Sequence, residues 1–311
     1  MSLSMAATRA LLRLRLRLRF RPRSTESEDS LVRSVARQGS AAPVTRAVHR
    51  VATVEEARVG GARVVTLRPR RAPSGVHVVY LHGGAYVHPV LATHWNLLAG
   101  LVRASGAVVT VPLYGLAPAH DVDDALPLLD AVLADVRRAS PSRVVVAGDS
   151  AGGALALVAA MRGRDAGRPA PDALVLFSPW VDALLDSPAI DEVAPLDPML
   201  ARDGLVAAGR WWAGDRDPAD PVVSPVRGDL SGLPPVFAYA GDRDLLTPDV
   251  KRLAAGVTAA GGRVELRLYR GAFHDFVGAP WTPEARRALR HAASVIRGDA
   301  SIAGRTAPPR A

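Results

Sequence analysis

The feature that most constrains the fold is a strand–turn–helix passage, Val144–Ala160, which reads "VVVAGDSAGGALALVAA". The β-branched run Val144–Val146 is typical of a buried parallel strand, and the alanine-rich run Ala154–Ala160 is typical of a buried helix. Only Gly148–Gly153 lie between them, so the chain reverses direction within a few residues. A strand followed so closely by a helix predicts an α/β fold with a mainly parallel sheet.

The turn inside this passage has the pattern G-x-S-x-G, centred on Ser150. Gly148 and Gly152 stand where a Cβ would collide across so sharp a turn. A serine in this position has a strained backbone and projects its Oγ above the sheet, as a nucleophile requires. The alternative is a glycine-rich turn that cradles a phosphate at the start of the helix. Partners for Ser150 elsewhere in the sequence decide between the two interpretations.

The remainder of the chain predicts alternating strands and helices. Two early strands precede a β-α-β-α alternation, which indicates helices on both faces of the sheet. The expected strands are Val51–Val54, Val64–Leu67, Val76–Leu81, Ala107–Val111, Arg143–Ala147, Ala173–Phe177, Val236–Ala240 and Val264–Tyr269. The expected helices are His94–Ala104, Asp124–Arg138, Ala151–Arg164, Pro248–Ala260 and Pro283–Ile296.

One connection, from Asp182 to about Leu233, is long and rich in proline and aspartate. Connections of that length inside an α/β domain are usually functional insertions such as lids. A helical piece is expected around Met199–Trp212. The adjacent Trp211 and Trp212 either line an acyl pocket or pack the insertion onto the body of the protein, and we favour the packing role.

A serine hydroxyl needs a base to act as a nucleophile, and the base needs an orienting acid. His274, in "YRGAFHDF", follows the last expected strand and would reach the same sheet edge as Ser150. The stretch "PVFAYAGDRDLLTPD", at the preceding strand, offers Asp242 and Asp244. We choose Asp244 as the acid because two leucines follow it as a packing anchor. Asp242 stays as the alternative, since it lies nearer to the strand end and could instead cap the turn.

A tetrahedral reaction intermediate also needs backbone N–H donors for its oxyanion. In "VVYLHGGAYV", the expected strand Val76–Leu81 ends in His-Gly-Gly, and glycines let the backbone approach a substrate closely. We therefore expect an oxyanion hole formed by the N–H groups of Gly83, Gly84 and Ala151, the last of which directly follows the nucleophile.

Spacing and composition argue against a metal or a cofactor. His82, His88 and His94 stand six residues apart, which matches no common zinc pattern. No P-loop or strand-linked G-x-G-x-x-G pattern occurs, so a nucleotide cofactor is not expected. The chain has no cysteine, which excludes disulfides and thiolate catalysis and fits a reducing compartment. We accordingly expect a cytoplasmic protein.

The 311-residue chain has a formal net charge of +9, but the charge is unevenly placed. Residues 1–23 contain seven arginines and no acid, so the remainder is nearly neutral and no nucleic-acid partner is expected. Their core, "LLRLRLRLRF", alternates apolar and basic residues, a pattern that also suits an anionic membrane surface. We favour a poorly ordered tail over membrane contact for residues 1–23, and we expect a second tail at 301–311.

The motifs together resemble the hormone-sensitive-lipase-like group of bacterial esterases in the α/β-hydrolase superfamily. The matching segments, in family order between about residues 76 and 280, are "HGGAYV", "VPLYGLAPAH", "GDSAGG", "SPWVD", "DPML", "SPVRGDLSGLPPVFAYAGDRDLL" and "GAFHDF". The resemblance implies an α/β-hydrolase domain over residues 24–300, with a helical cap formed by about 24–50 and 182–233. One departure is Ala85, which stands where the family has a third glycine after the histidine.

The activity implied by the resemblance is that of a carboxylesterase or lipase-like hydrolase, which cleaves a small carboxylic ester through an acyl-enzyme without a cofactor. Ser150 would attack the ester carbonyl, His274 would transfer the proton, and Asp244 would orient His274. Two alternatives use the same fold: a non-catalytic ligand-binding protein, and an acyltransferase that uses the same three residues. The presence of both Ser150 and His274 argues against the first alternative, because a dead site needs neither.

Overall fold

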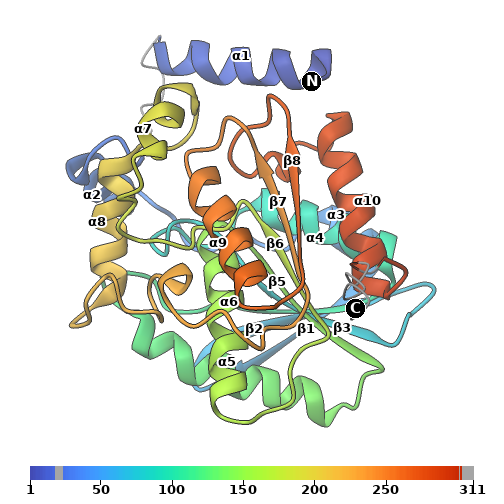
Figure 1. The fold of residues 1–311 in the computed structure, drawn as a ribbon. Helices are drawn as coiled ribbons and strands as arrows, with labels where there is room; N and C mark the ends of the chain where they lie inside the picture. Colours follow the sequence, from blue (N-terminus) through green and yellow to red (C-terminus); the bar gives the residue numbers. More distant parts are fainter. Residues whose placement is uncertain (18–23, 301, 303–311) are drawn as a thin grey trace, which may run out of the picture.

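The computed structural model describes residues 1–17, 24–300 and 302. Within them, eight strands form one sheet in the order β1-β2-β4-β3-β5-β6-β7-β8 (Figure 1). The β1–β2 and β2–β4 pairs are antiparallel and all other pairs are parallel, so the predicted mainly parallel sheet is confirmed. The strands are β1 (Ala52–Val59), β2 (Ala62–Pro69), β3 (Val76–Leu81), β4 (Val108–Pro112), β5 (Arg143–Asp149), β6 (Ala173–Phe177), β7 (Val236–Gly241) and β8 (Val264–Tyr269).

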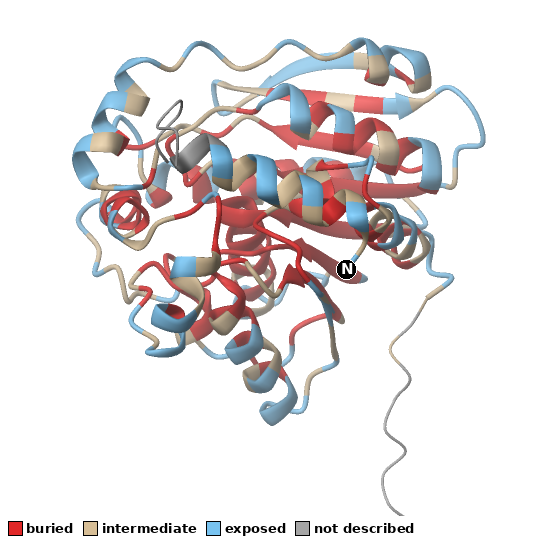
Figure 2. Ribbon diagram, turned by 90° about the horizontal axis from the view of Figure 1, so that it is seen from above, coloured by how far each residue is buried: buried red, intermediate tan, exposed pale blue. Residues whose placement is uncertain are grey.

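Helices cover both faces of this sheet, as predicted. In β5, Val144 and Val146 face one apolar core with α5, α6 and α9, whereas Val145 and Ala147 face the other with α4 and α10. Seen from above, the strands form a buried layer between helices that are exposed on their outer sides (Figure 2). The α-helices are α1 (Leu3–Arg17), α2 (Glu28–Ala36), α3 (Arg46–Val51), α4 (Ala92–Ser105), α5 (Val122–Arg138), α6 (Ser150–Asp165), α7 (Ala189–Val193), α8 (Arg202–Ala213), α9 (Thr247–Ala259) and α10 (Pro283–Arg297). Short 3-10 turns are η1 (Ala194–Leu196), η2 (Pro225–Arg227) and η3 (Phe276–Gly278).

The turn between β5 and α6 is built as the sequence predicts. Ser150 is the first residue of α6 and has φ +49°, a left-handed conformation that is strained for a residue with a Cβ. A Cβ on Gly152 would overlap the carbonyl group of Leu81 at the end of β3, so this position requires glycine. The turn therefore presents the serine at the carboxyl edge of the parallel strands.

The long connection after β6 and the segment before β1 pack against each other, chiefly through α8 and α2. Thr25 Oγ1 accepts a 2.9 Å hydrogen bond from the N–H of Ala201, and Thr25 O accepts one of 3.0 Å from the N–H of Gly204. Trp212 is fully buried and stacks on Tyr86, with their ring centroids 4.3 Å apart. Trp212 thus packs the insertion onto the body, which is the role favoured from the sequence.

The N-terminal segment differs from the expected poorly ordered tail. Leu3–Arg17 form helix α1, which lies across one end of the molecule (Figure 1). The N–H and Oγ of Ser2 donate to the Glu284 carboxylate at 2.6 and 2.7 Å, and Met5 is fully buried. These tertiary contacts fix a short helix that local propensity alone would leave marginal. Residues 18–23, 301 and 303–311 lie outside the described residues, and no helix in the described part is long and apolar enough to span a membrane.

Candidate active site

The candidate site is organised around Ser150, which the β5–α6 turn places in a cavity of about 390 Å³. Ser150 is only 5% exposed. The walls of the cavity are mainly apolar and include the side chains of Leu12, Leu91, Leu97, Met199, Leu200, Leu205, Phe273, Val277 and Trp281. A cavity of this volume with apolar walls and a few polar groups suits a small uncharged molecule.

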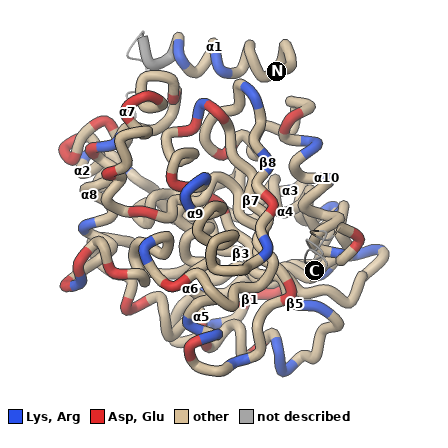
Figure 3. Tube along the Cα trace, in the orientation of Figure 1, with Lys and Arg blue, Asp and Glu red and all other residues tan. Residues whose placement is uncertain are grey.

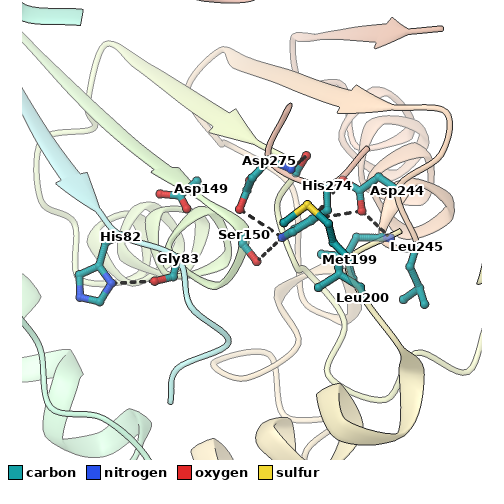
Figure 4. Close-up of polar contacts among 12 residues, drawn as sticks. His82, Gly83, Asp149, Ser150, Met199, Leu200, Asp244, Leu245, His274 and Asp275 are labelled. Carbon is teal, nitrogen blue, oxygen red and sulfur yellow. Dashed lines mark hydrogen bonds and ion pairs between the residues drawn. The ribbon is translucent and has the colours of Figure 1, made fainter. Parts of the chain in front are cut away.

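His274 connects Ser150 to Asp244 (Figure 4). Its Nε2 lies 3.0 Å from Ser150 Oγ, and its Nδ1 lies 3.2 Å from each carboxylate oxygen of Asp244. Asp244 follows β7 and His274 follows β8, so neighbouring parallel strands deliver both side chains to the edge where the β5–α6 turn lies. Both side chains are buried, which strengthens these hydrogen bonds. The structure thus brings together the three residues selected from the sequence.

Asp242, the alternative acid, has a different partner. Its Oδ1 accepts a 2.6 Å hydrogen bond from the N–H of Gly271, and its side chain is 40% exposed. Asp242 therefore joins the end of β7 to the loop after β8, and of the two candidate acids it is Asp244 that contacts His274.

A second buried carboxylate, that of Asp197 in the "DPML" segment, supports the loop that carries Asp244. Its Oδ2 accepts a 2.7 Å hydrogen bond from the N–H of Leu245. Its Oδ1 accepts hydrogen bonds from the N–H groups of Met199 and Leu200 at 2.6 and 2.9 Å. Burial, followed by the nearby charge of Asp244, raises the pKa of Asp197 to about 6. Asp197 thereby ties the long connection to the Asp244 loop, a role that the motif alone did not reveal.

Asp275 is another carboxylate at the His274 ring, and sequence reasoning did not select it. Its Oδ2 lies 3.2 Å from Nε2 of His274, the nitrogen that also faces Ser150 (Figure 4). Asp275 has φ +49°, and its N–H donates to Ser178 Oγ at 3.2 Å, which fixes the residue beside the ring. The position of Asp275 directly after the histidine in "HDF" was the sign of this contact that the sequence offered.

The two carboxylates set the proton affinity of His274. Burial lowers the pKa of His274, but Asp275 and Asp244 outweigh burial, so this pKa is raised well above its usual value. Burial also raises the pKa of Asp275 to about 6, against the lowering effect of His274. The charges of Asp275 and Asp244 therefore favour the imidazolium form of His274 over the neutral ring.

The His-Gly-Gly loop after β3 runs beside Ser150. A Cβ on Gly83 would stand 3.0 Å from the Cβ of Ser150. Gly84 has φ +123°, and a Cβ there would meet the carbonyl oxygen of His88 at 2.5 Å, so this position requires glycine. Within the described residues, the N–H groups of Gly83 and Gly84 donate to no protein acceptor. Ala151 lies in the first turn of α6, where N–H groups lack a partner within the helix.

Neighbouring aromatic side chains support this loop. Tyr114 donates its hydroxyl hydrogen to the carbonyl oxygen of His82 at 2.6 Å, and the two rings stack 4.5 Å apart. The Nδ1–H of His82 donates to the carbonyl oxygen of Gly83 at 2.7 Å. Burial lowers the pKa of His82 to about 4, so a neutral imidazole holds the loop. Ala85 lines the cavity with φ +53°, a left-handed conformation that favours glycine.

Asp149, directly before Ser150, holds a further polar network. Its Oδ1 accepts a 2.6 Å hydrogen bond from the hydroxyl of Tyr80, and its Oδ2 lies 3.2 Å from Nε2 of His94. The N–H of Leu91 donates to Nδ1 of His94 at 2.8 Å, which leaves the Nε2 proton facing the carboxylate. His94 thus acts as a hydrogen-bond donor. In the part of the chain that the structure describes, no three His, Asp or Glu side chains are arranged to hold a metal ion.

The family of the chain follows from a comparison with known proteins. Residues 78–278 match the family model described as the alpha/beta hydrolase fold. The chain belongs to the alpha/beta-hydrolase family. The match runs from β3 to η3 and so includes Ser150, Asp244 and His274.

Several known proteins match this alpha/beta hydrolase over most of its length. LipR of Mycobacterium tuberculosis is 35% identical over 243 residues, which cover 77% of this chain and 79% of LipR. An acetyl-hydrolase of Streptomyces hygroscopicus is 33% identical over 244 residues, which cover 77% of this chain and 81% of that protein. The crystal structure of an esterase from the bacterial hormone-sensitive lipase family superposes with a TM-score of 0.79 at 27% identity, covering 96% of this chain and 98% of that one. The predicted membership of the hormone-sensitive-lipase-like group is thereby confirmed.

Proposed function

We propose that this alpha/beta hydrolase is a serine carboxylesterase that cleaves small, uncharged carboxylic esters through an acyl-enzyme intermediate. The observation that carries the proposal is the position of His274, whose two ring nitrogens lie within hydrogen-bond distance of Ser150 Oγ and the Asp244 carboxylate. The relatives support the same chemistry, since one is named an acetyl-hydrolase and another an esterase.

In the proposed reaction, Ser150 Oγ attacks the ester carbonyl carbon while Nε2 of His274 takes the hydroxyl proton. The Oγ–C bond forms, the bond to the leaving alcohol oxygen breaks, and His274 returns the proton to that oxygen. A water molecule, deprotonated by His274, then attacks the acyl carbon, and Ser150 regains a proton as the carboxylic acid leaves. Asp244 accepts the Nδ1 hydrogen bond throughout, which keeps the lone pair of Nε2 directed at the serine.

The negative charge that develops on the carbonyl oxygen would be held by the N–H groups of Gly83, Gly84 and Ala151. The unused N–H groups of the two glycines and the position of Ala151 at the start of α6 support this assignment. Donors already in place need no rearrangement as the charge appears, which is why such sites lower the barrier.

We also propose that residues 24–50 and 182–233 form a cap over the cavity of the domain that spans residues 24–300. Thr25 from the first segment and Leu205 from the second both line the cavity. The cap would exclude water from the ester and shape the pocket for its acyl group.

A serine-directed phosphonate and a chromogenic ester test the proposal together. We expect turnover of p-nitrophenyl acetate and a single phosphonyl adduct, which peptide mass spectrometry places on Ser150. His274→Gln should lose both while the circular dichroism spectrum is unchanged. Absence of turnover with acyl chains from acetyl to decanoyl, together with absence of an adduct, would contradict the proposal and favour the non-catalytic ligand-binding alternative.

Product analysis in the presence of an added alcohol separates hydrolysis from acyl transfer. The proposal predicts free carboxylic acid as the main product, whereas an acyltransferase would form mainly the new ester. The cytoplasmic location expected from the cysteine-free sequence is part of the proposal, and cell fractionation tests it.

A further inference from the structure

Helix α1 carries apolar side chains on the side that faces solvent. Leu3 is 91% exposed, Leu11 is 51% exposed and Leu14 is 50% exposed. With the exposed Ala7 and Ala10, these leucines recur at steps of three and four residues and so form one stripe along the helix, here called the α1 face. A helix that packs on a protein normally turns polar residues outward, so an apolar outer face calls for a partner.

The opposite side of α1 is fixed to the protein beside the cavity of Ser150. Met5 is fully buried, and Thr8 and Leu12 line the cavity. The indole N–H of Trp281 donates to Thr8 Oγ1 at 2.9 Å. These contacts hold the α1 face outward and make the helix a wall of the cavity at the same time.

The exposed apolar surface continues around the mouth of the cavity. Trp281 is 59% exposed, Leu91 49% and Met199 37%, and all three line the cavity. Among the exposed large hydrophobic side chains of the described residues, only Val32 and Leu268 lie outside this rim, α1 and the adjoining Met1. The exposed apolar side chains are thus concentrated at the mouth of the cavity and on the helix beside it.

The charge of this region indicates what kind of surface it fits. Figure 3 shows basic and no acidic segments on α1, and residues 1–23 contain seven arginines and no acid. Arg9 and Arg13 line a groove of about 380 Å³ together with Ala10 and Leu14 of the α1 face. Arg13 also donates to the carbonyl oxygen of Leu196 at 3.0 Å. A basic helix with an apolar outer stripe suits an anionic lipid interface, because positive charge attracts the headgroups while the leucines can reach the acyl chains. A nucleic acid would use the arginines but would leave the leucines in water.

We propose that the α1 face docks this hydrolase on an anionic lipid surface, and that the adjoining cavity then takes up esters carried by that surface. The substrate class is accordingly an ester with apolar groups that partitions into lipid. Docking does not depend on catalysis, whereas the delivery of esters rests on the proposed function of Ser150. The two parts are therefore tested separately.

Docking is tested with the full chain carrying Ser150→Ala, so that catalysis plays no part. We expect the protein to co-sediment with vesicles of phosphatidylglycerol and phosphatidylcholine, to bind pure phosphatidylcholine about tenfold more weakly, and to dissociate as salt rises. The pair Leu11→Ser and Leu14→Ser should weaken binding at least about tenfold, since each removes an apolar chain from the lipid. The pair Val32→Ser and Leu268→Ser, which removes exposed apolar chains elsewhere, should leave binding unchanged.

Several outcomes would overturn the docking proposal. They are equal binding to neutral and anionic vesicles, equal binding by the leucine pair and its control pair, and binding to duplex DNA without binding to vesicles. Vesicle binding by a chain that turns over no ester would leave docking standing and would contradict the proposed function instead.

Delivery is tested with Ser150 intact and two esters. The leucine pair should hydrolyse soluble p-nitrophenyl acetate with unchanged kcat/KM, because neither Leu11 nor Leu14 lines the cavity. The same protein should hydrolyse a long-chain ester embedded in phosphatidylglycerol vesicles about tenfold more slowly than the control pair, in line with its loss of binding. Unchanged hydrolysis of the embedded ester despite lost docking would contradict the delivery of esters from the surface.

Discussion

The carboxylate of Asp275 lies 3.2 Å from Nε2 of His274 and so shares this nitrogen with the hydroxyl of Ser150. A charged carboxylate at this position favours the imidazolium form, in which Nε2 holds a proton and cannot accept one from serine. The site therefore contains an acid that opposes the base function of His274 as well as one, Asp244, that orients it.

Replacing Asp275 should make the enzyme active at lower pH. The pKa of His274 is raised by the Asp275 and Asp244 charges despite burial, so Asp275→Asn removes one cause and lowers that pKa. Because the neutral ring is the active form, the acidic limb of the kcat/KM profile should move down by roughly one pH unit or more. Asp242→Asn serves as the control and should leave the limb in place. An acidic limb that stays fixed or moves upward in Asp275→Asn would show that this carboxylate does not control the base.

The two candidate acids should differ sharply in their effect on catalysis. Asp244→Asn keeps the shape of the side chain but favours the wrong tautomer of His274, so kcat should fall about 10⁴-fold. Asp242→Asn weakens a hydrogen bond to Gly271 and should cost about 1 kcal/mol of stability with little loss of kcat. Steady-state kinetics and urea unfolding of both variants measure this. A larger kcat loss for Asp242→Asn than for Asp244→Asn would reverse the assignment.

The backbone of Gly84 should tolerate no side chain. Its φ is +123° and a Cβ would meet the His88 carbonyl, so Gly84→Ala must displace an N–H group assigned to the oxyanion hole. We expect kcat to fall about 10²- to 10³-fold. Gly100→Ala is the matched control, because Gly100 lies inside α4, and a Cβ there would meet no atom of the described residues within 4 Å apart from its chain neighbours and its own helical turn. The control should keep full activity, and equal activity of both variants would remove Gly84 from the proposed oxyanion hole.

Asp249 should make the fold less stable as pH rises. This carboxyl is buried in the first turn of α9, and neither oxygen has a hydrogen-bond partner within the described residues. Burial, followed by Asp182, raises its pKa to about 7, so folding takes up a proton between about pH 4 and 7. The free energy of unfolding should therefore fall through this window, by up to about 1.4 kcal/mol per pH unit from this group.

Asp249→Asn should remove this contribution, so its stability relative to wild type should increase from pH 4 to pH 7. Urea unfolding at several pH values measures the difference, with the exposed Asp191→Asn as control. Parallel curves for wild type and Asp249→Asn would mean that folding does not raise the pKa of Asp249.

The sequence predicted the parts of this protein that depend on local pattern and chain order. The limits of β3, β6 and β8 agree with the expected strands because mainly apolar or alternating runs bounded by turns are strong local signals. The predicted meeting of Ser150, Asp244 and His274 followed from their places after parallel strands that end at one sheet edge.

The features that the sequence did not predict depend on tertiary contacts. Helix α1 is held in place by the hydrogen bond from Ser2 to Glu284, a residue 282 positions away. The local sequence pattern does not predict such a distant contact. Asp197 contacts the Asp244 loop from the long insertion, whose sequence shows no regular hydrophobic period. The carboxylate of Asp275 meets the ring from a residue with a left-handed backbone, which the sequence pattern does not predict.

The most direct test of the account is the kcat of Ser150→Ala on p-nitrophenyl acetate, measured beside wild type after identical purification. Loss of the nucleophile from such a triad typically lowers kcat by about 10⁶-fold, and the small hydroxyl can be removed without disturbing the fold. We expect no turnover above the uncatalysed rate from a variant with the circular dichroism spectrum and unfolding midpoint of wild type. Turnover within about tenfold of wild type would contradict a serine mechanism at Ser150.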